Sequence, residues 1–134
     1  MATNVRYRAG IQSLTRSMPV HTSTRSGDIV LISSSLVGVA ETDGDGGTTS
    51  GTPTGQPDGF ATVSLQCTVG PTKVNIAGAG NFGDPVYAGT VTNGIVTALT
   101  LTASTNKRIG YLMQRNHVTN TPGEVLLAAE AVAD

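Results

Sequence analysis

A strict two-residue alternation between apolar and polar side chains runs through residues 61–69. The apolar positions are Ala61, Val63, Leu65, Cys67 and Val69, and threonine, serine or glutamine fills each position between them. Successive side chains of a β-strand point to opposite faces, so this period places all the apolar groups on one face. The segment therefore predicts one strand over 61–69, with Cys67 as a small buried thiol.

Short β-rich runs bounded by turn residues recur along the rest of the chain. We expect strands within residues 28–32, 36–40, 73–77, 86–92, 95–102 and 107–114. The pair Asn93-Gly94 separates two of these runs and is the strongest hairpin signal, because both residues tolerate the positive φ that the tight turn needs. Several short strands joined by turns predict an all-β domain, either a small sandwich or a barrel.

The C-terminal segment supports two interpretations. Thr121, Pro122 and Glu124 fit a helix-capping pattern with proline at the first helical position, and the Ala- and Leu-rich residues after them favour a helix locally. An all-β chain commonly closes its sheet with its last element, which favours a strand starting near Glu124. The sequence leaves both open.

Size and charge limit the classes of protein that the chain can belong to. Its 134 residues suit one domain with a real core. Only 13% of the residues are charged and the net charge is −1, so no nucleic-acid partner is expected. The single cysteine excludes an intrachain disulfide. We also expect no leader segment and no membrane partner, because no apolar stretch is long enough.

The charges are distributed unevenly. The first 27 residues contain four arginines and no acidic residue, and they show no periodicity. We expect residues 1–27 to form an extended N-terminal arm rather than a packed element, with residues 28–134 as the β domain. A frayed terminus is the alternative. Arginine is enriched at interfaces, so the candidate contact residues are Arg6, Tyr7, Arg8, Arg16 and Arg25.

A second unusual segment covers residues 42–59. It consists of glycine, threonine, serine, proline, aspartate and glutamine, without an aliphatic or aromatic side chain. Such a stretch has nothing to bury and must form a surface loop. Because it has no apolar anchor, we expect this loop to be mobile in the free protein unless a partner orders it.

Patterns that suggest enzyme or cofactor chemistry fail on inspection. Residues 78–83 match the dinucleotide fingerprint G-x-G-x-x-G, but a β-rich run follows where the fingerprint needs a helix. Residues 43–47 resemble the start of a calcium loop, but Gly47, Thr48 and Thr54 occupy positions that need other residues. His21 and His117 lie far apart in sequence. We therefore expect no enzyme, no cofactor and no metal site.

Five short segments occur in a particular order: Ser-Gly-Asp-Ile-Val at 26–30, Leu-Val-Gly-Val-Ala at 36–40, Gly-Asp-Pro-Val-Tyr at 83–87, Ile-Gly-Tyr at 109–111 and Gly-Glu-Val at 123–125. This series, spread over residues 25–128, resembles the capsid decoration (cement) proteins of tailed bacteriophages, a family formerly catalogued as a domain of unknown function in phages and prophages. The arm and the 42–59 loop depart from the family's compact pattern.

The matched residues suit a scaffold role. In each Gly-Asp unit, the glycine can adopt positive φ, the aspartate can bond nearby backbone, and the next residues begin a strand. With the hairpin, the expected structural turn residues are Gly27, Asp28, Gly83, Asp84, Pro85, Asn93 and Gly94.

The resemblance implies a tulip-like or jelly-roll fold and a structural role. Such a protein would bind the outer surface of a phage head and stabilise the capsid by bridging shell subunits. The implied partners are the major capsid protein and further copies of this chain, as a dimer or trimer at a capsid symmetry axis. The implied location is the virion surface after synthesis in the host cytoplasm. A tail-associated or carbohydrate-binding β module is the alternative, although two Phe and three Tyr supply few aromatic platforms.

Overall fold

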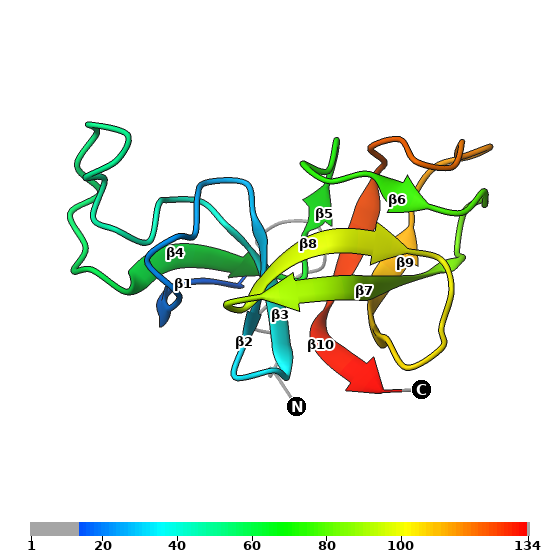
Figure 1. Ribbon diagram of the computed structural model, residues 1–134, viewed down its shortest axis with the longest axis horizontal. Helices are drawn as coiled ribbons and strands as arrows, with labels where there is room; N and C mark the ends of the chain where they lie inside the picture. The colour runs from blue at the N-terminus through cyan, green and yellow to red at the C-terminus, as the bar shows by residue number, and fades with distance from the viewer. Residues whose placement is uncertain (1–13, 134) are drawn as a thin grey trace, which may run out of the picture.

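The computed structural model describes residues 14–133 (Figure 1). Strands joined by turns and loops are the only regular secondary structure in these residues. The strands are β1 Leu14–Pro19, β2 Ile29–Ile32, β3 Leu36–Ala40, β4 Phe60–Leu65, β5 Thr68–Val69, β6 Ile76–Ala77, β7 Pro85–Thr92, β8 Ile95–Thr100, β9 Lys107–Leu112 and β10 Val125–Ala133. The all-β prediction is confirmed. The run expected at 73–77 is a strand only in its last two residues.

Six of the strands close into an antiparallel barrel. Their order is β3, β2, β8, β7, β9 and β10, and β10 returns to β3 by pairing Glu130 with Leu36. Of the two predicted architectures, the structure is therefore the barrel. Its interior is filled by aliphatic side chains with almost no exposed surface, among them Val37, Ile76, Val86, Leu99, Ile109, Leu112, Val125 and Leu127. Full closure removes the free edges that an open sheet would carry.

Two strands extend the sheet beyond the barrel. β4 pairs with β3 of the barrel, and β1 pairs with the other edge of β4. We call β1 and β4 together the flap. The flap covers a second apolar cluster formed by Met18, Val30, Ile32, Ala61, Val63 and Leu65. The expectation that residues 1–27 do not pack is therefore wrong for residues 14–19. Met18 is buried in this cluster because β1 places alternate side chains against the sheet.

The strand predicted over 61–69 is broken at its centre. β4 ends at Leu65, Gln66 has a φ of +52°, and β5 pairs with β10 on the barrel. The chain leaves the flap at this corner and joins the barrel, so one alternating pattern serves two sheet positions. Cys67 lies at the corner, half-buried against the barrel core, and burial, with a smaller contribution from the charge of Glu41, raises the pKa of its thiol.

The first Gly-Asp turn precedes β2. Gly27 has a φ of +91°, and the Asp28 carboxylate accepts a hydrogen bond of 2.7 Å from the Arg25 N–H. The Asp28 N–H in turn donates to the Arg25 carbonyl at 3.0 Å. Ala40 of β3 closes the turn, since its carbonyl accepts from Gly27 and its N–H donates to Asp28. The turn thereby fixes the start of β2 against the end of β3.

The second Gly-Asp turn precedes β7 and has the same geometry. Gly83 has a φ of +87°, and the Asp84 carboxylate accepts from the Asn81 N–H at 2.9 Å. Leu112 of β9 takes the part that Ala40 takes in the first turn, accepting from Gly83 and donating to Asp84. Pro85 is the first residue of β7, where a missing N–H does little harm. Two distant segments therefore use one device to start a barrel strand.

The C-terminal ambiguity is decided in favour of a strand. β10 pairs with β9, β5 and β3, and the barrel closes only through it. Val125 and Leu127 point inward with no more than 1% of their surface exposed. A helix here would leave one edge of β9 and one edge of β3 unpaired, a cost that the local helix propensity of alanine and leucine does not offset.

Candidate functional site

The candidate contact residues divide between two parts of the chain. Arg6, Tyr7 and Arg8 lie outside the described residues. Arg16 is exposed on β1. The Arg25 guanidinium is half-buried and makes hydrogen bonds within the chain. It donates to the backbone carbonyls of Thr22 and Thr24 at 2.9 and 2.8 Å. It also donates to the Thr49 hydroxyl at 3.0 Å, so it connects the residues before β2 with the 42–59 loop.

Two carboxylates organise the 42–59 loop. Asp45 accepts hydrogen bonds from the backbone N–H groups of Gly47 at 3.0 Å and Thr49 at 3.1 Å. Asp43 is 9% exposed and accepts from the Ser26 N–H at 2.9 Å. The premise that the loop has no anchors within the chain is therefore wrong, and its mobility in the free protein stays a prediction. The loop is held by polar anchors, which the absence of apolar residues did not exclude.

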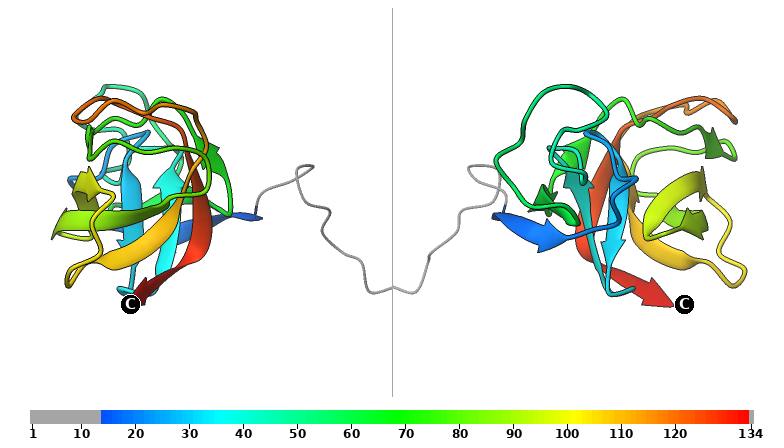
Figure 2. Two further views of the ribbon diagram at one scale, coloured as in Figure 1. Left: turned by 90° about the vertical axis from the view of Figure 1, so that its right-hand side faces the viewer. Right: turned by 60° about the vertical axis from the view of Figure 1, so that its left-hand side comes forward.

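The loop forms a projection at one end of the molecule. Figure 1 shows it extending beyond β1 and β4, at the opposite end from the connection between β9 and β10. The same end carries the flap, and Figure 2 shows β1 on the outside of the molecule. The flap and the loop therefore form one continuous surface away from the closed barrel.

One face of the flap carries hydrogen-bonded polar side chains, some of them buried, whose partners the sequence alone did not reveal. Thr15 of β1 and Ser64 of β4 bring their hydroxyl oxygens within 3.0 Å, and Ser64 donates to the Glu41 carboxylate at 2.9 Å. Ser17 donates to the side-chain carbonyl of Gln56 at 2.6 Å. Of these bonds, the one between Ser17 and Gln56 joins the flap to the 42–59 loop. The β4 alternation indicated a polar face, but its β1 partner had no recognisable pattern.

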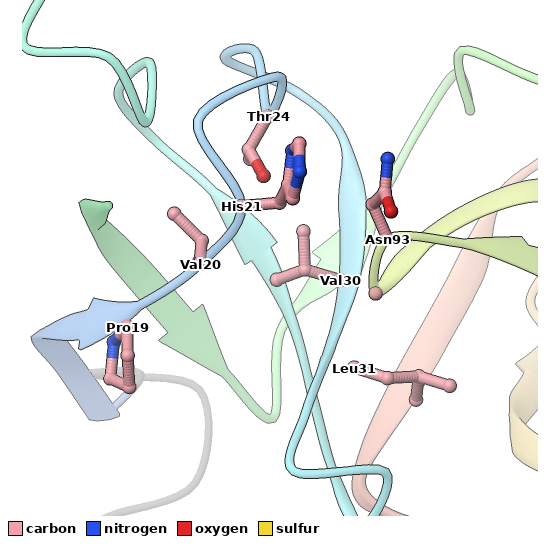
Figure 3. Close-up of a pocket in the computed structure, with 8 residues that line it drawn as sticks. Pro19, Val20, His21, Thr24, Val30, Leu31 and Asn93 are labelled. Carbon is pink, nitrogen blue, oxygen red and sulfur yellow. The ribbon is translucent and has the colours of Figure 1, made fainter. Parts of the chain in front are cut away.

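A small pocket lies between the flap side of the molecule and the β7–β8 hairpin (Figure 3). Its volume is about 230 Å³, and its lining residues are Pro19, Val20, His21, Thr24, Val30, Leu31, Asn93 and Gly94. Thr24 has no exposed surface, and its hydroxyl has no hydrogen-bond partner among the described residues. The pocket lies where the two apolar clusters meet, since Val30 belongs to one and Leu31 packs against the other.

The segments that suggested cofactor or metal chemistry have structural roles. Residues 78–83 form a turn that leads into β7, with no helix start to hold a phosphate. His21 is exposed and its Nδ1 accepts from the Ser23 N–H at 3.0 Å. His117 is buried, with Nε2 3.1 Å from the Ile76 carbonyl. Within residues 14–133, no three histidine, cysteine or acidic side chains are grouped as a metal ion would need.

No family model, curated protein or solved structure matches the chain. In the part of the chain that the structure describes, no helix is long and apolar enough to cross a membrane. The candidate site is therefore the surface formed by the flap and the 42–59 loop, with the small pocket beside it.

Proposed function

We propose that this protein is a structural virion protein that binds the outer surface of a phage head and stabilises the capsid by bridging neighbouring shell subunits. The observation that carries the proposal is the ordered series of segments that resembles capsid decoration proteins. Two of those segments, at Gly27-Asp28 and Gly83-Asp84, form turns with one hydrogen-bond pattern, which supports treating them as equivalent units.

The architecture supports an adhesive mechanism. The barrel is closed and its core is aliphatic, so it provides a rigid body. The flap and the 42–59 loop extend from one end, where the loop exposes hydroxyl and carboxylate side chains, among them Thr52 and Asp58. Each contact of this kind contributes little, but many copies on a symmetric lattice add up. Bridging in this way opposes the separation of neighbouring subunits under internal pressure.

The test is binding of purified protein to heads that lack a decoration protein. We expect co-sedimentation that saturates at a simple ratio to the shell protein, and decorated heads that release DNA at a higher temperature than bare heads. A small β-barrel protein unrelated to this chain serves as the control. Failure to bind at any concentration would contradict the proposal. Binding to host-cell polysaccharide but not to heads would favour a carbohydrate-binding module.

A further inference from the structure

Among the strands of residues 14–133, none lies beside the outer edge of β1. β1 stands at one end of the strand order and pairs only with β4 among the described strands. An edge strand of this kind exposes backbone N–H and C=O groups that a second strand can bind.

The register identifies which backbone groups of β1 point away from β4. In an antiparallel pair, alternate residues direct both backbone groups toward the partner, and the residues between them direct theirs away. The Glu41 N–H donates to the Thr62 carbonyl at 2.7 Å, so Thr62 and Ser64 bond on the β3 side of β4. Residues 61, 63 and 65 therefore bond on the β1 side, to their partners Met18, Arg16 and Leu14.

A second bond gives the same phase independently. The Val20 N–H donates to the Gly59 carbonyl at 2.8 Å, so residue 20 and every second residue before it face β4. Thr15, Ser17 and Pro19 consequently direct their backbone groups outward. The free edge offers the N–H and C=O of Thr15 and Ser17 and the C=O of Pro19, which has no N–H to give.

We propose that two copies of this chain pair antiparallel through β1, about a two-fold axis centred on Ser17. In this register, Ser17 exchanges two hydrogen bonds with Ser17 of the second copy, and the Thr15 N–H of each copy donates to the Pro19 carbonyl of the other. Within the described residues, a register centred on Thr15 would leave the Ser17 and Pro19 groups unused. The edge is thus self-complementary over its described length.

The side chains are compatible with this pairing. Arg16 faces Met18 of the second copy, so the two arginines are not directly opposed, and direct opposition of like charges would be unfavourable. Both copies use the same surface, so the contact is isologous and closed by a two-fold axis. It therefore predicts a dimer and not a trimer. Its area is small, so we expect a dimer that dissociates on dilution, with a dissociation constant of about 10 μM to 1 mM. This pairing does not depend on the proposed capsid binding.

The first test is residue-resolved amide exchange on the full chain over a concentration series. Between about 10 μM and about 2 mM, we expect exchange at Thr15 and Ser17 to slow by about twofold for the weakest dissociation constant expected and by about tenfold for the strongest. The amides of Arg16 and Met18 serve as internal controls, because β4 already binds them and their exchange should stay constant relative to the rest of the barrel.

The second test compares Ser17→Pro with Ser17→Ala by sedimentation velocity. Both changes remove the hydroxyl that donates to Gln56 at 2.6 Å, but only proline removes the outward N–H. We expect Ser17→Ala to dimerise like the original protein and Ser17→Pro to weaken dimerisation by about tenfold or more. The exchange experiment needs no variant, so it decides the question if Ser17→Pro does not fold.

Several results would overturn the proposal. One is a protein that is entirely monomeric at about 2 mM, where more than half of the chain would be dimeric even at the weakest dissociation constant expected. Another is protection of Thr15 and Ser17 that does not change with concentration, which would mean that the chain's own preceding residues occupy the edge. Protection that appears only when phage heads are added would assign the edge to the shell protein. Dimerisation of Ser17→Pro at the original strength would exclude β1 as the interface.

Discussion

The guanidinium of Arg25 lies 3.3 Å from a carboxylate oxygen of Asp45. This ion pair joins the segment that leads into β2 to the 42–59 loop, and the Asp45 carboxylate also receives the backbone N–H groups of Gly47 and Thr49. An arginine predicted as an intermolecular contact is thus an intramolecular anchor, and the loop predicted to lack anchors is held by it.

The order of this loop should depend on pH through Asp45. The pKa of Asp45 is lowered, and the largest cause is the hydrogen bond from the Thr49 side chain. The backbone N–H groups of Thr49 and Gly47 and the charge of Arg25 lower it further, whereas burial raises it. When folding lowers the pKa of a carboxyl group, the group stabilises the folded state at any pH above its ordinary pKa of 3.8. That contribution is lost as the pH falls through the pKa of the folded state.

We therefore expect the amide protection factors of Gly47 and Thr49 to be constant near neutral pH and to fall below about pH 4. The measurement is amide exchange by NMR, with intrinsic rates corrected for pH. Asp45→Asn is the control, since it should show weaker protection with no such transition. Protection that persists unchanged to pH 2 in the original protein would contradict the anchoring role.

Replacing Gly94 with valine should destabilise the protein strongly. Gly94 has a φ of +76°, and a Cβ there would lie 3.1 Å from the Leu31 carbonyl oxygen. Gly51 is the matched control, because its φ is +78° and a Cβ there would meet no atom within 4 Å. We expect about 1–2 kcal/mol of destabilisation from backbone strain at either site, and more at Gly94. Urea denaturation measures both, and equal losses would contradict the steric argument.

Replacing Thr24 with valine should stabilise the free protein. The buried Thr24 hydroxyl has no partner among the described residues, so the isosteric change removes an unsatisfied polar group at a gain of about 1 kcal/mol. Thr72 is the control. It is also buried, but its hydroxyl donates to the Val74 carbonyl at 2.7 Å and accepts from the Gly123 N–H at 3.0 Å. Thr72→Val should cost about 1–3 kcal/mol. Thermal denaturation that shows a loss for both would indicate that a bound water or ligand satisfies Thr24.

Two N-terminal deletions should differ in stability. Deleting residues 2–13 leaves β1 in place, so the thermal stability of the body should be nearly unchanged. Deleting residues 2–20 removes β1 and the buried Met18, exposes the second apolar cluster, and should cost about 3 kcal/mol or more. Calorimetry of both proteins tests this, and equal melting temperatures would show that β1 does not stabilise the rest of the β domain.

The shorter deletion also tests whether the arm binds phage heads. If Arg6 and Arg8 make charged contacts, removing residues 2–13 should lower head occupancy, and added salt should weaken binding of the full chain. The pair Arg6→Ala and Arg8→Ala should reproduce part of the loss, about 1–3 kcal/mol for desolvated ion pairs. Equal occupancy by truncated and full-length protein at every concentration would assign the binding to the barrel and flap.

The strands found correctly from the sequence share a local cause. Alternation indicated which face of residues 61–65 points inward, and Asn93-Gly94 indicated the β7–β8 hairpin. Both signals are local, because side-chain direction and tolerance of positive φ depend on neighbouring residues only. The strand at β1 escaped notice because Leu14–Pro19 mixes polar, charged and apolar residues, and only pairing with β4 gives them two faces.

The all-β class and most of the turns were thus determined by the sequence itself, through local backbone preferences and side-chain periodicity. The tertiary structure alone decided where the 61–69 pattern breaks, that residues 125–133 form a strand, and which groups anchor the 42–59 loop. Each of these depends on hydrogen bonds between segments far apart in the chain. Their energy depends on the partner that folding brings into place, and local sequence does not specify that partner.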